Sequence, residues 1–272
     1  MHDDRDNLTE LAKDMGADII GFADPEMWNV YDEVPHEFRP SSIWPEVNTV
    51  IVLGIGMLLP IVEMTPSILH TEMYRTCNGE LDSLAFNLAR YLNRQQHASI
   101  FFPRDAYGDI NILIQNPYAA FSHVMAAKYA GLGTIGLSHN LLTPSFGPRV
   151  RFVSVFTSLK LAPDSVLNKE LCTRCLACVK CCPVKAISSQ EDTIIGKLDS
   201  IACAKYHSEL NKKRSYPCGI CTKVCPIGAD RKLYNSKHSL QKYQNEAEAL
   251  AADPEHPDYK SWIHVRRYGR WP

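Results

Sequence analysis

The sequence predicts an α+β protein in which a layered sheet-and-helix domain is followed by a small cysteine-rich domain. In residues 1–165, segments with helical spacing of apolar residues alternate with short strand-like runs, and only one cysteine occurs. The other nine of the ten cysteines lie within residues 166–232. A chain of 272 residues is long enough for two domains. We therefore expect one domain over 1–165, a metal-dependent domain over 166–232 and a C-terminal tail over 233–272.

The first helix and strand follow from local signals. Asn7 and Glu10 have the spacing of a capping box, which predicts a helix that opens there and ends at Gly16. Residues 17–23 (ADIIGFA) then form an apolar run that indicates a strand.

The other elements of the first domain are predicted from apolar periodicity. Residues 48–57 are continuously apolar, as in a strand that is covered on both faces. Apolar residues recur at helical spacing over 71–97, and a strand over 98–103 and a helix over 119–130 follow. Residues 140–157 have the pattern of a hairpin that turns at Pro-Ser-Phe-Gly-Pro. Helices interleaved with a largely antiparallel sheet complete the α+β prediction.

The composition excludes some functions. Hydrophobic residues make up 45% of the chain, charged residues 22%, and the net charge is −1. Nucleic-acid-binding domains usually carry a basic surface, so we expect no nucleic-acid partner. The charged N-terminal segment MHDDRDNLTELAKDMG has no apolar stretch of the kind found in secretory signals. We therefore expect a cytoplasmic protein without a membrane span.

Eight cysteines carry the strongest functional signal. They form two blocks that each end in Cys-Pro, with one cysteine between the blocks. In chain order these cysteines are Cys172, Cys175, Cys178, Cys182, Cys203, Cys218, Cys221 and Cys225. The first block has the C-x2-C-x2-C-x3-C-P spacing of bacterial two-cluster ferredoxins, in which the fourth cysteine binds the other cluster.

That rule divides the eight cysteines into two complete sets of four. The first set is Cys172, Cys175, Cys178 and Cys225, and the second set is Cys182, Cys203, Cys218 and Cys221. Each set matches the ligands of a 4Fe–4S cluster. Structural zinc would use two separated C-x2-C pairs, and disulfides would require an oxidising compartment. Cys77 and Cys181 are left over, and we expect them to be packing residues.

A glycine-rich loop lies before the cysteines. Gly131, Gly133 and Gly136 match the G-x-G-x-x-G pattern of dinucleotide sites. Here, however, a predicted helix precedes the loop and a strand follows, which is the reverse of the order in a dinucleotide fold. The glycines therefore indicate either close packing of helix and sheet or a flat cofactor laid against bare backbone.

The run AAKYAGLGTIGLSHNLLTPSFGPRVRFVSVFT resembles the central segment of the epoxyqueuosine reductases and of the related corrinoid reductive dehalogenases. Members of these families place such a glycine loop just before a double-cluster ferredoxin module. The IACAKYHSEL segment around Cys203 is also similar to theirs. The resemblance covers residues 100–230 best. It implies a nitroreductase-like first domain that holds cobalamin and a ferredoxin-like second domain with two 4Fe–4S clusters.

Two features distinguish this chain from the family members that reduce epoxyqueuosine in tRNA. Those proteins have an aspartate, thought to donate a proton, in a Val-Asp motif before the glycine loop. The matching position here falls near 116–118 (Asn-Pro-Tyr), and the nearest carboxylate is Asp109. Those proteins also have a helical-repeat extension that grips tRNA, for which this chain has no room. The resemblance therefore implies shared redox machinery and a different substrate.

We expect single electrons to pass from a low-potential donor through the two clusters to a cofactor in the first domain. By the resemblance this cofactor is cobalamin, held between the glycine loop and Ser122 and Asn140. Tyr118 or His123 has the chemistry to donate a proton to the substrate. Each of the two could instead be a packing residue.

Two other functions remain open at this point. An electron-transfer protein could reduce the corrinoid of a partner methyltransferase, with the aromatic and basic segment Trp262 to Trp271 as its docking surface. A flavin enzyme would hold FMN, whose phosphate needs basic residues, and Arg149 and Arg151 lie near the glycine loop. We expect both arginines to lie instead on a solvated strand face.

Overall fold

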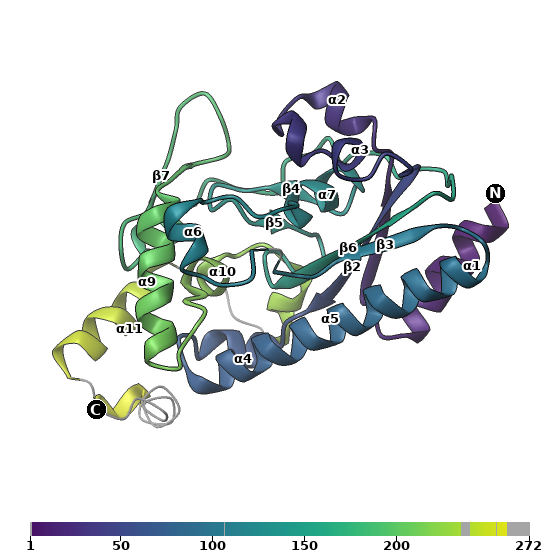
Figure 1. Cartoon of the computed structure of the whole chain (residues 1–272). Coiled ribbons are helices and arrows are strands. Elements are labelled where there is room, and N and C mark those ends of the chain that lie inside the picture. Colours follow the sequence, from purple (N-terminus) through teal and green to yellow (C-terminus); the bar gives the residue numbers. More distant parts are fainter. Residues whose placement is uncertain (1, 106, 235–239, 254, 260–272) are drawn as a thin grey trace.

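The computed structural model describes residues 2–105, 107–234, 240–253 and 255–259 (Figure 1). A four-stranded sheet in the order β1-β2-β6-β3 forms the centre of the N-terminal part, and every neighbouring pair is antiparallel. Its strands are β1 (Ile19–Ala23), β2 (Thr49–Gly56), β3 (Ser99–Phe102) and β6 (Val150–Thr157). The expected α+β class with an antiparallel sheet is confirmed.

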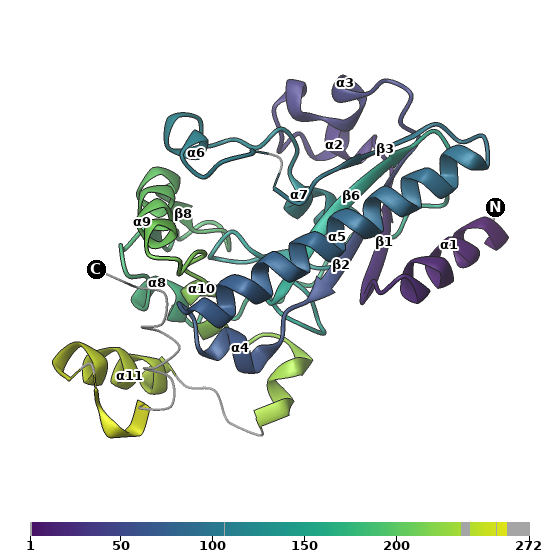
Figure 2. The same ribbon diagram turned by 60° about the horizontal axis from the view of Figure 1, so that its bottom comes forward.

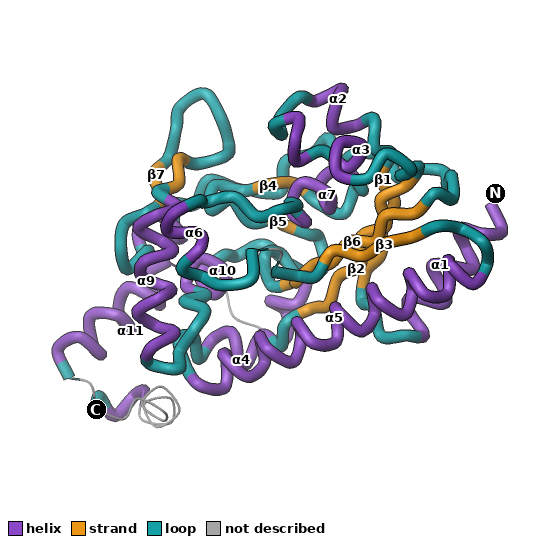
Figure 3. Tube along the Cα trace, viewed as in Figure 1, coloured by secondary structure: helices purple, strands orange, loops and turns teal. Residues whose placement is uncertain are grey.

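Helices cover both faces of this sheet (Figures 1 and 3). On one face, α1 (His2–Asp14) and α5 (Ile68–Arg94) pack their apolar side chains on β2 and β6. On the other face lie α2 (Met27–Tyr31), α3 (Pro40–Ile43) and α7 (His123–Tyr129). Because β2 is covered from both sides, its first six residues are buried, as the continuous apolar run predicts.

The early helices differ from the predictions mainly at their ends. The first helix begins at His2, so Asn7 lies inside it and the predicted start at a capping box is wrong. Gly16 follows the helix with a φ of 103°, a conformation that glycine adopts readily, and this end is as expected. The helix predicted over 119–130 is shorter, because the Ser122 side chain accepts a hydrogen bond from the Met125 amide and caps α7.

The predicted hairpin over 140–157 is wrong. Its first arm, β5 (Leu141–Leu142), pairs with β4 (Thr134–Ile135), whereas β6 pairs with β2 and β3 in the main sheet. The turn itself forms, with Thr143 and Gly147 paired through two backbone hydrogen bonds. After this turn the chain leaves one sheet for the other, which local patterning does not reveal.

The cysteine-rich part lies beside the first turns of α5 (Figure 2). It contains α8 (Ala177–Lys180), β7 (Ile187–Ser188), β8 (Lys197–Leu198), α9 (Ser200–Lys212), α10 (Ile220–Val224) and η2 (Ala229–Tyr234). Here α10 contacts α4 (Leu59–Glu63), and α9 contacts α6 (Ile112–Gln115). The remaining elements are η1 (His36–Phe38), α11 (Leu240–Ala252) and η3 (Pro257–Tyr259).

The helix α11 lies within the C-terminal tail. The aromatic and basic segment 262–271 lies outside the described residues. Within the described part of the chain, no helix combines the length and apolar character needed to cross a membrane.

Candidate functional site

The structure brings the eight cysteines together in two groups of four. The first group lines a small cavity of about 20 Å³ and consists of Cys172, Cys175, Cys178 and Cys225. The second group lines a much larger cavity and consists of Cys182, Cys203, Cys218 and Cys221. This division is the same as the one derived from the ferredoxin spacing.

Neighbouring thiols influence one another within the groups and between them. Burial raises the pKa of Cys178 to about 12, and the nearby thiols of Cys221, Cys225, Cys175 and Cys172 raise it further. Burial likewise raises the pKa of Cys218 to about 12, with Cys221, Cys203 and Cys182 as neighbours. Four cysteines so placed would need a cationic centre to be deprotonated together, and the all-sulfur donor set suits iron–sulfur chemistry. Among the described residues, no three His, Cys, Asp or Glu side chains converge on a single-ion site.

Neighbouring polar groups fix the sulfur atoms of the second group. The Asn140 side-chain amide donates to Cys221 Sγ at 3.4 Å, and the Ala186 amide donates to Cys182 Sγ at 3.2 Å. Asn140, which the sequence placed at the cofactor, therefore contacts a cysteine while it also lines the large cavity.

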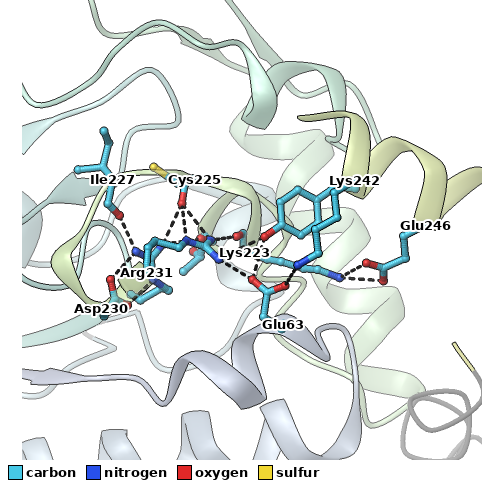
Figure 4. Close-up of polar contacts among 11 residues, drawn as sticks. Glu63, Lys223, Cys225, Ile227, Asp230, Arg231, Lys242 and Glu246 are labelled. Carbon is cyan, nitrogen blue, oxygen red and sulfur yellow. Dashed lines mark hydrogen bonds and ion pairs between the residues drawn. The ribbon is translucent and has the colours of Figure 1, made fainter. Parts of the chain in front are cut away.

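Two arginines hold the backbone carbonyl of Cys225 in the first group. Arg149, fully buried, donates from Nη1 to this oxygen at 3.0 Å and forms a two-pronged ion pair with Asp230 at 2.6 and 2.7 Å. Arg231 donates to the same oxygen from Nε at 3.1 Å and from Nη2 at 2.9 Å, and it pairs with Glu63 (Figure 4). The first cysteine group is thereby connected to both β6 and α4.

A buried ion pair connects the same region to α11. Lys223 Nζ lies 2.8 and 3.0 Å from the two carboxylate oxygens of Glu246, and both side chains are almost completely buried (Figure 4). In addition, the Tyr243 hydroxyl donates to Glu63 Oε1 at 2.8 Å. Hydrogen bonds from Arg231 and Tyr243 outweigh burial and lower the pKa of Glu63.

These contacts also correct the interpretation of the two arginines near the glycine loop. Neither lies on a solvated strand face: Arg149 is enclosed by the cysteine-rich part, and Arg151 pairs with Asp105 at 2.8 Å. The Arg149 guanidinium donates hydrogen bonds to the Asp230 carboxylate and to backbone carbonyls.

The large cavity is the most promising place for chemistry. It has a volume of about 510 Å³, and its lining joins the second cysteine group to residues of α5, β6 and the loop after β3. Polar side chains in the lining interact in two sets. The hydroxyls of Tyr107 and Tyr216 lie 2.8 Å apart. Asp105 accepts hydrogen bonds from Tyr74 at 3.3 Å and from Arg151 at 2.8 Å.

Burial determines the protonation of these groups. It raises the pKa of Tyr74, Tyr107 and Tyr216 above the ordinary tyrosine value, so all three phenols carry their protons at neutral pH. Burial also lowers the pKa of His70 and His207 to about 4, which makes both imidazoles neutral. The cavity therefore presents neutral donors beside the cysteines, together with the Asp105 carboxylate and its two guanidinium partners, Arg151 and Arg104.

Of the side chains that the sequence predicts for cofactor binding or catalysis, some line the large cavity and one lies outside it. Ser122 and His123 line the large cavity, as Asn140 does. Both ring nitrogens of His123 have partners at 2.9 Å, namely Ser154 Oγ and the Pro103 carbonyl, which is the arrangement of a packing histidine. Tyr118 is 58% exposed and stacks on Phe38, away from the cavity lining.

The three glycines of the loop meet protein backbone and side chains. A Cβ atom would lie 2.3 Å from the Ser165 carbonyl oxygen at Gly131 and 2.0 Å from the Leu142 carbonyl oxygen at Gly133. At Gly136 it would lie 2.8 Å from the Leu142 side chain. Close packing, the first of the two interpretations of this loop, accounts for all three positions.

Sequence reasoning missed most of the polar cavity lining. The missed residues are Tyr74, Asp105, Tyr107, His70, His207 and Tyr216. They come from α5, α9 and separate loops, so no common motif marks them. One signal was available for Tyr216, which lies two residues before Cys218 and is therefore held next to the second cysteine group.

Comparisons with known proteins give two kinds of sequence relative. No family model matches the chain. It is 25% identical over 221 residues to the tetrachloroethene reductive dehalogenase of Dehalobacter restrictus, covering 77% of this chain and 35% of that protein. It is 29% identical over 150 residues to the epoxyqueuosine reductase of Listeria monocytogenes, covering 53% and 37%. The chain thus spans about a third of the length of these two relatives.

Solved structures show the same fold. A reductive dehalogenase structure described in connection with B12-dependent dehalogenation aligns with a TM-score of 0.65 at 20% identity, covering 96% of this chain and 37% of that chain. An epoxyqueuosine reductase with a tRNA-Tyr stem loop aligns with a TM-score of 0.56 at 17% identity, covering 99% and 77%.

Two sets of four cysteines, one of them in the wall of a large cavity, fit the ligand pattern of iron–sulfur clusters. Sequence and fold together show the particular relationship. The sequence relatives of the chain are reductive dehalogenases and epoxyqueuosine reductases, and solved structures of both kinds of protein share its fold.

Proposed function

We propose that this protein is a cobalamin-dependent reductase in which single electrons pass through two 4Fe–4S clusters to the large cavity. Each group of four cysteines holds one cluster, in a ferredoxin-like arrangement beside a nitroreductase-like sheet domain. One observation carries the proposal: the second cysteine group forms part of the wall of the cavity that also contains the tyrosines. Electrons delivered to that group are therefore next to the space where a cofactor and substrate can bind.

The cavity has the volume of a ligand or cofactor site. Its volume of about 510 Å³ lies within the range of cofactor and ligand sites, about 300–1,000 Å³. Apolar side chains such as Met57, Ile110 and Phe152 line it together with the polar groups. When bound, cobalamin would supply a cobalt centre that accepts single electrons and reacts with the substrate. FMN is less well supported, because Arg149 is already fully engaged and Arg151 is paired with Asp105.

Exposure of the cysteines suggests the direction of electron flow. Cys175 of the first group is exposed, whereas Cys218 of the second group is buried. A low-potential electron donor can therefore approach the first cluster from the surface. The second cluster would then receive the electron and pass it to the cavity.

Protons for the reduction would come from the tyrosines of the cavity. Tyr107 and Tyr216 share a hydrogen bond, and both remain protonated because burial raises their pKa. One phenol can donate its proton while the other stabilises the phenolate that forms. Arg151 and Asp105 hold the third phenol, Tyr74, in place. These residues take the role that the sequence assigned to Tyr118, which lies outside the cavity.

The first test is cofactor binding. We would reconstitute the clusters anaerobically, titrate the protein with cob(II)alamin and follow absorbance and electron paramagnetic resonance (EPR). The proposal predicts a saturable change in the cobalt signal. Replacing Ala119 in the cavity lining with tryptophan should weaken binding at least about tenfold, whereas Ala162→Trp at an exposed site should not change it.

Other results of this titration would favour other functions. Saturable binding of FMN and not of cobalamin would support a flavin enzyme. Reduction of a corrinoid carried by a partner methyltransferase, without binding of the free cofactor, would support an electron-transfer protein. Binding that Ala119→Trp leaves unchanged would contradict the cavity as the cofactor site.

A further inference from the structure

His70 is a buried histidine whose ring makes no hydrogen bond within the described residues. It lies in the first turn of α5 and is 1% exposed. Its backbone amide is capped by Ser67 Oγ at 3.2 Å, but Nδ1 and Nε2 both lack a partner of hydrogen-bonding geometry. The Pro217 carbonyl lies near enough to favour a protonated ring, without forming such a bond. The structure accounts for the position of this side chain and leaves its polar atoms unexplained.

The ring lies against the loop that carries two cysteines of the second group. A Cβ atom on Gly219 would be 2.8 Å from His70 Cε1 and 3.1 Å from Nε2. Gly219 has a φ of 68° and stands between Cys218 and Cys221. Next to it, Thr65 Oγ1 donates to the Cys218 carbonyl at 2.8 Å. The segment that leads into α5 therefore contacts the loop that contains Cys218 and Gly219, and it places the His70 imidazole against this loop.

The imidazole also faces the large cavity, which His70 lines together with all four cysteines of the second group. A buried imidazole nitrogen without a partner is unfavourable, so native structures rarely keep one. His123 illustrates the usual case, because both of its ring nitrogens have protein partners. A sulfur-rich group held by the four cysteines would provide an acceptor beside the otherwise unused N–H of His70.

We propose that His70 donates a hydrogen bond to a sulfur atom of the cluster held by Cys182, Cys203, Cys218 and Cys221, and so raises the reduction potential of that cluster. Hydrogen bonds to sulfur stabilise the more negative, reduced state and are a recognised means of tuning such potentials. The first cluster has no such partner in this proposal. His70 would thus make the second cluster the better electron acceptor and direct electrons toward the cavity. The inference rests on the proposed binding of two clusters.

The test is potentiometry of the anaerobically reconstituted full chain, followed by EPR. We expect His70→Leu to shift the midpoint of one cluster to a more negative value. At a fixed potential its ratio of reduced to oxidised form should fall about tenfold, equivalent to about 59 mV for one electron. The other cluster should not change. His70→Gln and His70→Asn place an amide near Nε2 or Nδ1, and one of them should restore most of the potential.

A matched control separates this effect from a general disturbance of α5. Thr71 lies one residue further along and is also buried, and its hydroxyl donates to the Ser67 and Arg214 carbonyls. Thr71→Val should leave both midpoints unchanged. If Thr71→Val moves the same midpoint as His70→Leu does, the shift reflects packing and the inference is overturned.

A second measurement can overturn the inference even if His70→Leu fails to retain its cluster. In the wild-type protein labelled with ¹⁵N only at histidine, pulsed EPR should detect a weak ¹⁵N coupling to one reduced cluster. Absence of this coupling would overturn the inference. If the wild-type protein holds two clusters and His70→Leu leaves both midpoints unshifted, only this inference is overturned. Wild-type protein without iron and sulfide would overturn the proposed function as well.

Discussion

At the scale of single residues, the buried histidines link stability to pH. Burial lowers the pKa of His123 from 6.5 to about 4. The unfolded chain therefore binds a proton on this residue at a higher pH than the folded chain does. The stability that the neutral ring contributes is fully present above about pH 6.5 and is lost as the pH falls toward 4.

The variant His123→Gln tests this linkage. Glutamine does not titrate, so the variant should lose about 2 kcal/mol less stability than the wild type between pH 7.5 and pH 5. Anaerobic urea unfolding at the two pH values measures the difference. The variant will be less stable at every pH because it disturbs the bonds to Ser154 and Pro103, so the pH slope is the readout. An unchanged slope would mean that the folded pKa of His123 is normal.

Two glycines provide a paired test of the packing interpretation of the glycine loop. At Gly133 a methyl group would lie 2.0 Å from the Leu142 carbonyl oxygen, so Gly133→Ala should lower the free energy of unfolding by at least about 1–3 kcal/mol. Gly79 lies on the exposed side of α5 with no atom within 4 Å of an added methyl group. Gly79→Ala should therefore stabilise the protein by about 0.5–1 kcal/mol. Equal effects at the two sites would contradict the packing interpretation.

At the scale of elements, Arg149 joins the start of the β6 strand to the cysteine-rich part. Replacing it with methionine would leave the Asp230 carboxylate without its ion-pair partner and would remove one donor from each of the Cys225 and Ile227 carbonyls. Removing one partner of a buried pair typically costs about 3–5 kcal/mol, so Arg149→Met should be strongly destabilising. It should also lower the iron content, because Cys225 belongs to the first group.

The control for Arg149→Met is an arginine in an exposed ion pair. Arg75 is 63% exposed and pairs with Glu72 on the same helix. Arg75→Met should change stability by no more than about 0.5 kcal/mol and leave the iron content unchanged. Thermal unfolding with iron analysis distinguishes the two variants. If Arg149→Met has little effect on both thermal stability and iron content, the guanidinium is not needed to hold β6 and the cysteine-rich part together.

The buried pair of Lys223 and Glu246 should behave as a coupled unit that holds α11. Either single change, Lys223→Met or Glu246→Leu, leaves a buried charge without its main partner and should cost more than about 3 kcal/mol. The double change should cost less than the sum of the singles by at least about 1 kcal/mol in a double-mutant cycle. Additive effects would show that the pair contributes no interaction energy.

The elements that could be predicted from the sequence are those whose signals are local and long. The helix α5 and the strand β2 are examples, because many apolar positions agree on one period. The hairpin over 140–157 failed because Leu141 and Val150 lie in different sheets, and strand pairing depends on distant partners. The start of α1 failed because a helix can extend beyond an internal capping pattern.

At the scale of the whole molecule, the cysteine groups were predictable and the cavity was not. Cluster-binding cysteines follow one another at fixed spacing, so the sequence alone divides them into two sets. The cavity side chains Tyr74, Asp105 and Tyr216 are far apart in the sequence and meet only through the fold. His123 and Tyr118 were chosen for their chemistry, but the contacts of a residue depend on its surroundings.

The central claim is that electrons pass from the second cysteine group into the cavity. The most direct measurement mixes chemically reduced protein with cob(II)alamin and follows both EPR signals after rapid freezing. The account predicts that the cob(II)alamin signal disappears as an equal amount of reduced cluster is oxidised. In Cys203→Ser, which lacks one ligand of the second group, the first cluster should stay reduced and the cobalt signal should persist. Reduced clusters that leave bound cob(II)alamin unchanged in the wild type would contradict the account.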